Sequence, residues 1–263
     1  MYAFEYRKPS SLQDAAAALA QSGGRALAGG QSLVAAMKLR LSQPGTLVDL
    51  AAIPELKGIR RDANGLTLGA MTRHAEVASS DIVKQAQPAL AALADGIGDR
   101  QVRNMGTLGG SIANNDPAAD WPGALLALGA TVNTNKRSIK ADDFFRGLYE
   151  TALEGDEIVT SVTFPLGSKA AYVKFPNPAS RFALVGVFVA KTPSGARVAV
   201  TGAGPCAFRC KPLEDALTKN WSSDAAKAVK IDAAGLNQDL HASSEYRAHL
   251  IGVLAARAVA AAG

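Results

Sequence analysis

The sequence of 263 residues contains few cysteines, histidines and aromatic residues. Its two cysteines, Cys206 and Cys210, are too few for an iron–sulfur cluster or for a disulfide framework. They follow C-x-x-x-C spacing beside Pro205 and Pro212, and we expect buried or unreactive thiols. A redox group of this chain is therefore not a metal bound by its own cysteines.

The three histidines do not form a metal-binding or catalytic pattern. Zinc sites and nucleophilic triads need several such groups at defined spacing, whereas His74, His241 and His249 are scattered. We expect His241 and His249 on the surface of the last helical region. His74 lies in "GAMTRHAEV", and two interpretations stay open: a residue that begins a helix, or a ligand contact. The sequence predicts no metal site.

Long apolar runs are also missing. Residues 1–14 carry Glu5 and Arg7 and lack the apolar region of a signal peptide. Residues 249–263 are apolar but short and interrupted by Arg257, so we expect no membrane span and a cytoplasmic protein. The net charge of +5 arises from Lys and Arg interleaved with Asp and Glu, which does not favour a nucleic-acid partner.

What the chain has is the composition and patterning of a folded α+β protein. Hydrophobic residues make up 48% and charged residues 19%, which is typical of globular proteins. Ser10 with Gln13 predicts a capping box for a helix that ends at Gly23-Gly24. A strand at 25–28, a helix at 32–41 and a strand at 46–53 follow, which completes a β-α-β-α-β unit.

The rest of the chain changes character after about residue 56. Asn64-Gly65 predicts a hairpin, and Pro193-Ser194-Gly195 predicts a second one within 181–204. Between and after them we expect helical patterns at 73–83 and 88–98, a glycine-rich loop at 104–120 that leads into the apolar segment 124–135, a strand at 157–165, and helices at 212–219 and 245–261. The last part of the chain begins with "AAYVKF" at 170–175. The sequence thus predicts three parts: 1–56 and 57–168 as two lobes, and 169–263 as a small domain of a sheet with helices.

One motif is misleading. "GAGPCA" at 202–207 fits the dinucleotide fingerprint G-x-G-x-x-A and follows a strand. The fingerprint requires a helix that begins within the motif, but Pro205 and Pro212 delay any helix, and the strand belongs to a hairpin. We interpret this segment as a structural turn.

Two glycine pairs point to a ligand instead. Gly29-Gly30 lies in "ALAGGQS" and Gly109-Gly110 in "TLGGS". A buried pyrophosphate needs hydrogen-bond donors, which backbone amides supply where no Cβ keeps the oxygens away. Ser32 adds a hydroxyl and begins a helix whose positive end suits an anion. One pair in each lobe indicates an extended dinucleotide held in the crevice between them.

The chain resembles the FAD-binding medium subunit of molybdenum hydroxylases over its whole length. The resemblance rests on "YRKPSSLQDAAAAL", "ALAGGQSLVAAMKLRL", "IGDRQVRNMGTLGGSIANNDPAAD", "RFALVGVFVA" and "GAGPCAFRCKPLEDAL". It implies an α+β fold with a two-lobed FAD-binding domain of the PCMH (vanillyl-alcohol-oxidase-like) type, followed by a small C-terminal domain of a sheet and helices.

The resemblance also implies which residues bind FAD. The pyrophosphate loops correspond to Leu27, Ala28, Gly29, Gly30, Gln31, Ser32 and Leu33, and to Thr107, Gly109, Gly110, Ser111 and Asn114. Asp120 corresponds to an acidic residue on the ribose or ribityl hydroxyls, and Ile97, Val159 and Lys174 to contacts near the flavin ring, with His74 close by. Gln31 stands where some members have His, and Phe182 stands near a tyrosine that covers the ring in some relatives. No catalytic residue is predicted.

The implied activity is that of an oxidoreductase component. Electrons pass from 2Fe–2S clusters on a small subunit to the flavin and on to a terminal acceptor, while a large subunit holds the molybdopterin cofactor, in a dimer of heterotrimers. One alternative is a self-sufficient flavoprotein oxidase of the same superfamily, which the short region after 168 disfavours. Another is a scaffold without cofactor, which the glycine pairs and Asp120 disfavour. Substrate and acceptor are not predicted.

Overall fold

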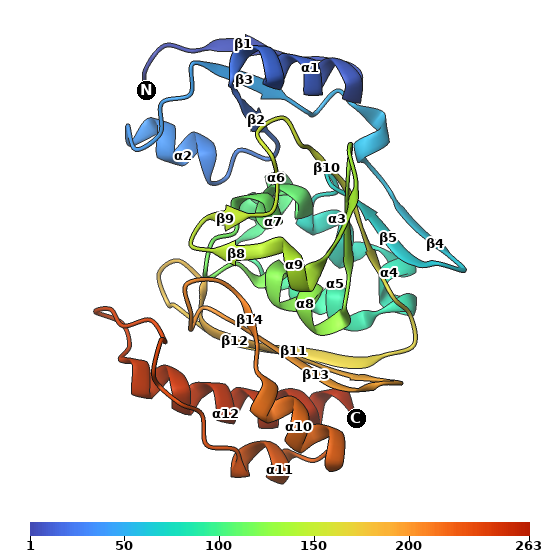
Figure 1. Ribbon diagram of the computed structural model, residues 1–263, viewed down its shortest axis with the longest axis vertical. Coiled ribbons are helices and arrows are strands. Elements are labelled where there is room, and N and C mark those ends of the chain that lie inside the picture. The colour runs from blue at the N-terminus through green and yellow to red at the C-terminus, as the bar shows by residue number, and fades with distance from the viewer.

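The structure is a computed structural model that describes residues Met1 to Gly263. Three β-sheets follow one another along the long axis of the molecule, each with helices packed on it, and a two-stranded ribbon accompanies the middle one (Figure 1). The N-terminal sheet lies at one end and the C-terminal helices lie at the other. The predicted α+β class is confirmed.

The first sheet is parallel, with strand order β1-β3-β2. The predicted β-α-β-α-β unit is confirmed, but its first helix begins one residue late because Ser11, not Ser10, is the N-cap and accepts from the Asp14 amide. The predicted helix at 32–41 is also too long. The elements are β1 (Glu5–Arg7), α1 (Leu12–Ser22), β2 (Arg25–Leu27), α2 (Leu33–Lys38), β3 (Thr46–Asp49) and a 3-10 turn η1 (Pro54–Leu56).

The second sheet is antiparallel, with strand order β4-β5-β10-β6-β7. Its first hairpin turns at Asn64-Gly65 as predicted, since Gly65 takes a φ of 142° and Asp62 accepts from the Asn64 amide. The strands are β4 (Ile59–Asp62), β5 (Gly65–Gly69), β6 (Thr131–Thr134), β7 (Ser138–Lys140) and β10 (Val159–Phe164), and the ribbon is β8 (Phe145–Gly147) with β9 (Glu150–Thr151).

Short helices cover this sheet. The helical pattern at 73–83 divides at Ser80, whose side chain accepts from the Val83 amide and caps a new helix. The predicted loop at 104–120 is wrong in part, because a helix runs through its glycine pair. The helices are α3 (His74–Ser79), α4 (Asp81–Ala86), α5 (Pro88–Asp95), α6 (Arg100–Met105), α7 (Leu108–Asn114), α8 (Asp120–Leu128) and α9 (Ala141–Phe144).

The third sheet is antiparallel, with strand order β11-β12-β13-β14. The hairpin predicted within 181–204 is confirmed, and "GAGPCA" is a turn, since no helix begins before Lys211. Helix α11 was not predicted. The elements are β11 (Lys169–Pro176), β12 (Ala183–Thr192), β13 (Gly195–Thr201), β14 (Phe208–Arg209), α10 (Lys211–Lys219), α11 (Ser223–Ala228) and α12 (Ser244–Ala262).

Three hydrophobic clusters of 31, 18 and nine buried residues hold these layers together. Alternate side chains of β12 enter two of them: Phe188 packs with the helices of the second sheet, and Val187 packs with α10 and α12. The smallest cluster belongs to the first sheet and includes Met71 and Ile158 from the second. No helix has the length and apolar character that crossing a membrane would require.

Candidate functional site

The loop between β2 and α2 leaves its backbone amides without partners. The amides of Gly29, Gly30, Gln31, Ser32 and Leu33 donate to no acceptor in the chain, and these residues are half-buried or exposed. Gly30 takes a φ of 73°, which favours glycine because it has no Cβ. Consecutive free amides in a concave turn form a site for an anion.

Gly29 brings this loop against the second part of the chain. A Cβ at Gly29 would lie 2.0 Å from the Met105 carbonyl oxygen and 2.8 Å from the Gly106 Cα. A Cβ at Gly110 would lie 3.4 Å from the Ala28 Cβ. The two glycine pairs predicted from the sequence therefore meet, as expected for a ligand held from both sides.

The second glycine pair has a different local role from the one predicted. Gly109 and Gly110 lie in the first turn of α7, and their amides are used: Gly109 donates to the Ala70 carbonyl at 2.8 Å and Gly110 to Thr107 Oγ1 at 3.1 Å. A Cβ at Gly109 would lie 2.6 Å from the Ala70 Cβ. The prediction that these two amides are free donors is wrong, because the Ala70 carbonyl next to β5 accepts from one and the N-cap Thr107 of the same helix accepts from the other.

Side chains of α7 are available instead. Ser111 and Asn114 are half-buried, lie on the helix that follows Thr107, and make no side-chain hydrogen bond within the chain. Thr107 is buried and occupied as the N-cap. The polar groups of this second loop that can still serve a ligand are therefore a hydroxyl and an amide side chain.

His74 is the first residue of α3 and lies beside the same junction. Its amide donates to the Gly106 carbonyl at 3.0 Å, and its imidazole is 4% exposed. The Trp121 indole donates to His74 Nδ1 at 3.1 Å. Burial, with the Arg103 charge nearby, lowers the pKa of His74 to about 4, so the ring is neutral at neutral pH.

Asp120 and Lys174, both predicted site residues, are joined to each other. Asp120 begins α8, is 4% exposed, and accepts from Lys174 Nζ at 3.0 Å and from the Tyr172 hydroxyl at 2.5 Å. Burial raises the pKa of Asp120, and the Lys174 charge and the Tyr172 hydrogen bond oppose this shift. The carboxylate thus connects α8 to β11.

Tyr172 is a site residue that sequence reasoning missed. It reaches Asp120 because Gly186 on β12 has no side chain: a Cβ there would lie 2.2 Å from the Tyr172 hydroxyl oxygen. Burial raises the pKa of Tyr172 well above its ordinary value, so the hydroxyl keeps its proton and donates. The available signal was the spacing of two between Tyr172 and Lys174, which places both on one face of a strand.

The remaining predicted residues lie on separate segments. Ile97 follows α5 and is half-buried, and Arg103 donates to its carbonyl at 3.0 Å. Val159 begins β10 and is 6% exposed, so its side chain belongs to the largest core cluster. Phe182 is 45% exposed beside Arg181, which donates to the Gly98 carbonyl at 3.3 Å.

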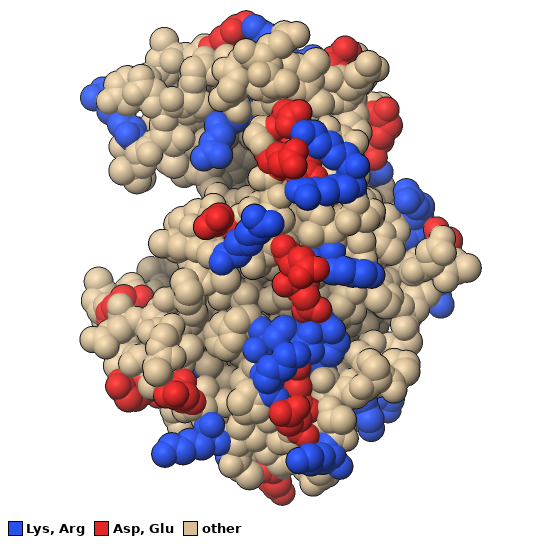
Figure 2. Space-filling model, viewed as in Figure 1, with Lys and Arg blue, Asp and Glu red and all other residues tan.

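The surface is hollowed where the first sheet meets the middle of the molecule. Figure 2 shows this hollow below the part that carries α2, and Figure 1 places the β8–β9 ribbon across from it. Lys and Arg are mixed with Asp and Glu over this face rather than gathered in one basic stripe. The fold and the loop of free amides together are those of a two-lobed α+β protein of the class that binds a dinucleotide cofactor.

Comparisons with known proteins give the family. The chain belongs to the family described as the FAD binding domain in molybdopterin dehydrogenase, which matches residues 2–167. It is 37% identical to the carbon monoxide dehydrogenase medium chain of Hydrogenophaga pseudoflava, over 98% of this chain and 96% of that one. It is 36% identical to the glyceraldehyde dehydrogenase medium chain of Sulfolobus acidocaldarius, over 97% and 96%.

Solved structures agree. Carbon monoxide dehydrogenase from Hydrogenophaga pseudoflava superimposes with a TM-score of 0.91 at 37% identity, covering 99% of this chain and 97% of that one. Quinoline 2-oxidoreductase from Pseudomonas putida 86 gives 0.90 at 31% identity, with 99% and 97% covered. The predicted family, the two-lobed FAD-binding fold, FAD as cofactor and the oxidoreductase class are confirmed.

Proposed function

We propose that this chain is the medium subunit of a cytoplasmic, multi-subunit molybdenum hydroxylase. In such an assembly, electrons from 2Fe–2S clusters of a small subunit reach FAD on this chain and leave to a terminal acceptor, after a large molybdopterin-binding subunit has oxidised the substrate. Relatives named medium chain or FAD-binding subunit support this assignment. We propose a dimer of heterotrimers as the complete assembly.

The free amides of the β2–α2 loop carry the proposal. Five consecutive amide donors without partners, on residues that are half-buried or exposed, suit the two negative charges of a pyrophosphate. Each charge-assisted hydrogen bond contributes about 1.5–3 kcal/mol, so several of them hold a nucleotide firmly. We assign pyrophosphate binding to the loop from Leu27 to Leu33. The Ser111 hydroxyl and the Asn114 side-chain amide on α7 contribute further hydrogen bonds from the other side.

The other half of FAD is assigned to the region around Asp120. We propose that Asp120 accepts from ribose or ribityl hydroxyls with the lone pairs that Tyr172 and Lys174 leave free. Ile97, the Val159 backbone and Lys174 are assigned to the flavin ring. In this division, 1–56 and 57–168 are the two lobes around FAD and 169–263 supplies Lys174 from its own sheet.

The test is flavin retention in matched glycine variants. Gly29→Ala places a Cβ against the Met105 carbonyl, which forces the free amides away from α7, so we expect purified protein with little bound FAD. Gly45→Ala is the control, because nothing lies within 4 Å of the added Cβ. FAD content is measured by visible absorbance after denaturation. Equal FAD content in the two variants would contradict the assignment of this loop.

A further inference from the structure

His74 has one ring nitrogen fixed by the core and one that is free. Trp121 is fully buried, and its indole N–H can only donate, so His74 Nδ1 must be the acceptor of the 3.1 Å hydrogen bond between them. A neutral imidazole that accepts at Nδ1 carries its proton at Nε2. The structure therefore selects a single tautomer of a buried histidine.

The free Nε2–H faces the junction of the two glycine loops. A Cβ at Gly106 would lie 2.7 Å from His74 Nε2, so this glycine leaves the edge of the ring uncovered. The Gly106 Cα in turn lies 2.8 Å from the position of a Cβ at Gly29. Trp121, His74, Gly106 and Gly29 thus form a line of contacts from the core to the loop of free amides.

Nothing in the chain accepts from this Nε2–H. The Trp121 contact is the only side-chain hydrogen bond of His74, and its backbone amide is used separately by the Gly106 carbonyl. The residue is 4% exposed, and Nε2 is not among the fully buried side-chain atoms that lack a partner, so this donor can be reached from the junction and can serve a ligand there. Its neighbours are the donors that we assign to an anion.

We propose that His74 donates from Nε2 to a pyrophosphate oxygen of FAD, and that Trp121 is a positioning residue that fixes the required tautomer. This inference rests on the proposed function of the loop at 27–33. The imidazole adds a neutral donor behind the junction, so the chain carries no unpaired buried charge there when FAD is absent.

The experiment compares FAD affinity in four variants of the full chain. His74→Gln keeps an N–H at a comparable reach, whereas His74→Leu removes it; we expect near wild-type affinity for the first and a roughly 10- to 100-fold loss for the second. Trp121→Phe keeps the ring but not its N–H, and we expect a smaller loss. His249→Leu, on the exposed side of α12, is the control.

A second readout separates positioning from mere stability. In ¹⁵N NMR spectra of histidine-labelled protein, we expect His74 to show a protonated Nε2 and an unprotonated Nδ1, and Trp121→Phe to show a mixture. Wild-type affinity in His74→Leu, or a protonated Nδ1 in the wild-type chain, would overturn the proposal. A wild-type chain that binds no FAD would overturn the proposed function itself. The NMR measurement of the His74 tautomer does not depend on bound FAD, so the two failures can be told apart.

Discussion

At the scale of single residues, Asp120 shows how a residue that we propose to bind FAD also stabilises the fold. Its carboxylate is buried with Lys174 Nζ and the Tyr172 hydroxyl, and these partners come from a strand in another sheet. Removing one member of a buried ion pair leaves the other charge without compensation, which costs more than the pair itself contributes. The same three groups thus connect the second and third parts of the chain.

Asp120→Asn is therefore expected to lower the free energy of unfolding. The amide keeps the shape of the carboxylate but leaves the Lys174 charge buried and unpaired, at a cost of about 3–5 kcal/mol. Urea unfolding followed by circular dichroism measures this. Asp224→Asn is the control, because its pair with Lys227 is exposed and contributes about 0–1 kcal/mol. A loss in Asp120→Asn no larger than in the control would contradict the buried pair.

The residues of the candidate site could be predicted from the sequence only in part. Asp120 and Lys174 were predicted by resemblance, but their mutual contact and Tyr172 were not, since they depend on β11 packing against α8. The free amides at Gly29 and Gly30 were predicted from the chemistry of glycine. Those of Gly109 and Gly110 were not correctly predicted, because the Ala70 carbonyl that accepts from Gly109 lies far away in the sequence, just after β5.

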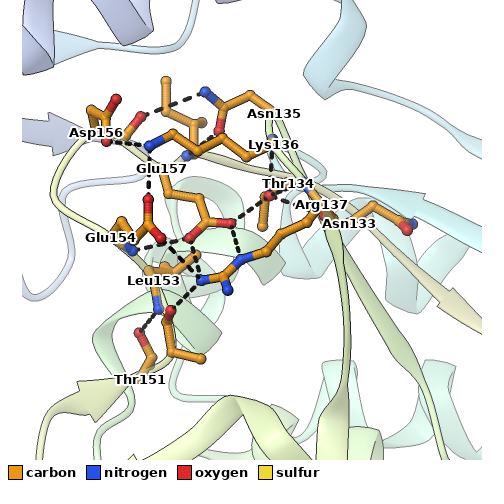
Figure 3. Close-up of polar contacts among 12 residues, drawn as sticks. Asn133, Thr134, Asn135, Lys136, Arg137, Thr151, Leu153, Glu154, Asp156 and Glu157 are labelled. Atoms are coloured by element: carbon orange, nitrogen blue, oxygen red, sulfur yellow. Dashed lines mark hydrogen bonds and ion pairs between the residues drawn. The ribbon is translucent and has the colours of Figure 1, made fainter.

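At the scale of elements, a polar network ties the β6–β7 turn to the segment before β10 (Figure 3). Arg137 donates twice to the buried Glu157 carboxylate, each time at 3.0 Å, and once to the Ala152 carbonyl at 2.8 Å. Asn135 accepts from the Ile158 amide at 2.8 Å. The network thereby fixes the start of β10, where we assign Val159 to the flavin ring.

Arg137→Ala is expected to remove an acid-sensitive part of the stability. The hydrogen bond from Arg137 lowers the pKa of Glu157 to about 2 from an ordinary 4.5. A carboxyl with a lowered folded-state pKa stabilises the fold above its unfolded pKa, and this contribution disappears as pH falls from about 4.5 to about 2. Wild type should lose stability over that window more steeply than Arg137→Ala.

The measurement is thermal unfolding across pH 2–5 for both proteins. Lys136→Ala is the matched neighbour, since Lys136 pairs with the more exposed Glu154 and Asp156 and not with Glu157. Lys136 also lowers the pKa of the more exposed Asp156 carboxyl, so Lys136→Ala should flatten the slope, but less than Arg137→Ala does. Parallel slopes for wild type and Arg137→Ala would show that the Glu157 carboxylate does not depend on this guanidinium.

Elements were predicted well where local chemistry decides them. The turn at Asn64-Gly65 and the end of α1 at Gly23 are examples, because their geometry depends on adjacent residues, whereas the start of α1 was predicted one residue too early. Helix α7 was taken for a loop because its glycines weaken helix propensity, whereas the Thr107 cap and packing on β5 outweigh that cost. Helix α11 is six residues long, too short for its periodicity to be recognised.

At the scale of the whole molecule, the first sheet is attached by little hydrophobic surface. Its cluster has nine buried residues, against 31 and 18 in the other two. Further attachment comes from the Met71 amide, which donates to the Leu56 carbonyl at 2.7 Å, and from the close contact of Gly29 with Met105 and Gly106. The order of the three parts along the chain could be predicted from the sequence pattern and the family resemblance. The close contact of Gly29 with Met105 and Gly106 could not, because it joins segments that are far apart in the sequence.

Bound FAD should therefore stabilise the chain by bridging the two lobes. Ligand that binds only the folded state adds about 2.7 kcal/mol at a free concentration of 100 times Kd. We expect the melting temperature to rise with added FAD and protease cleavage within the first 56 residues to slow. Gly29→Ala should show neither effect. Equal melting temperatures with and without FAD in the wild-type chain would contradict a bridging cofactor.

Because Trp121 contacts His74, the intrinsic fluorescence of Trp121 can report on events at the junction of the lobes. Trp221 is the second tryptophan, and it lies half-buried beneath Lys191 in the C-terminal region. Replacing it with phenylalanine leaves one indole emitter, enclosed in the core and one imidazole away from the junction of the lobes. Its emission spectrum and lifetime then report on protonation of that imidazole, and loss of emission by energy transfer reports the arrival of a visible chromophore.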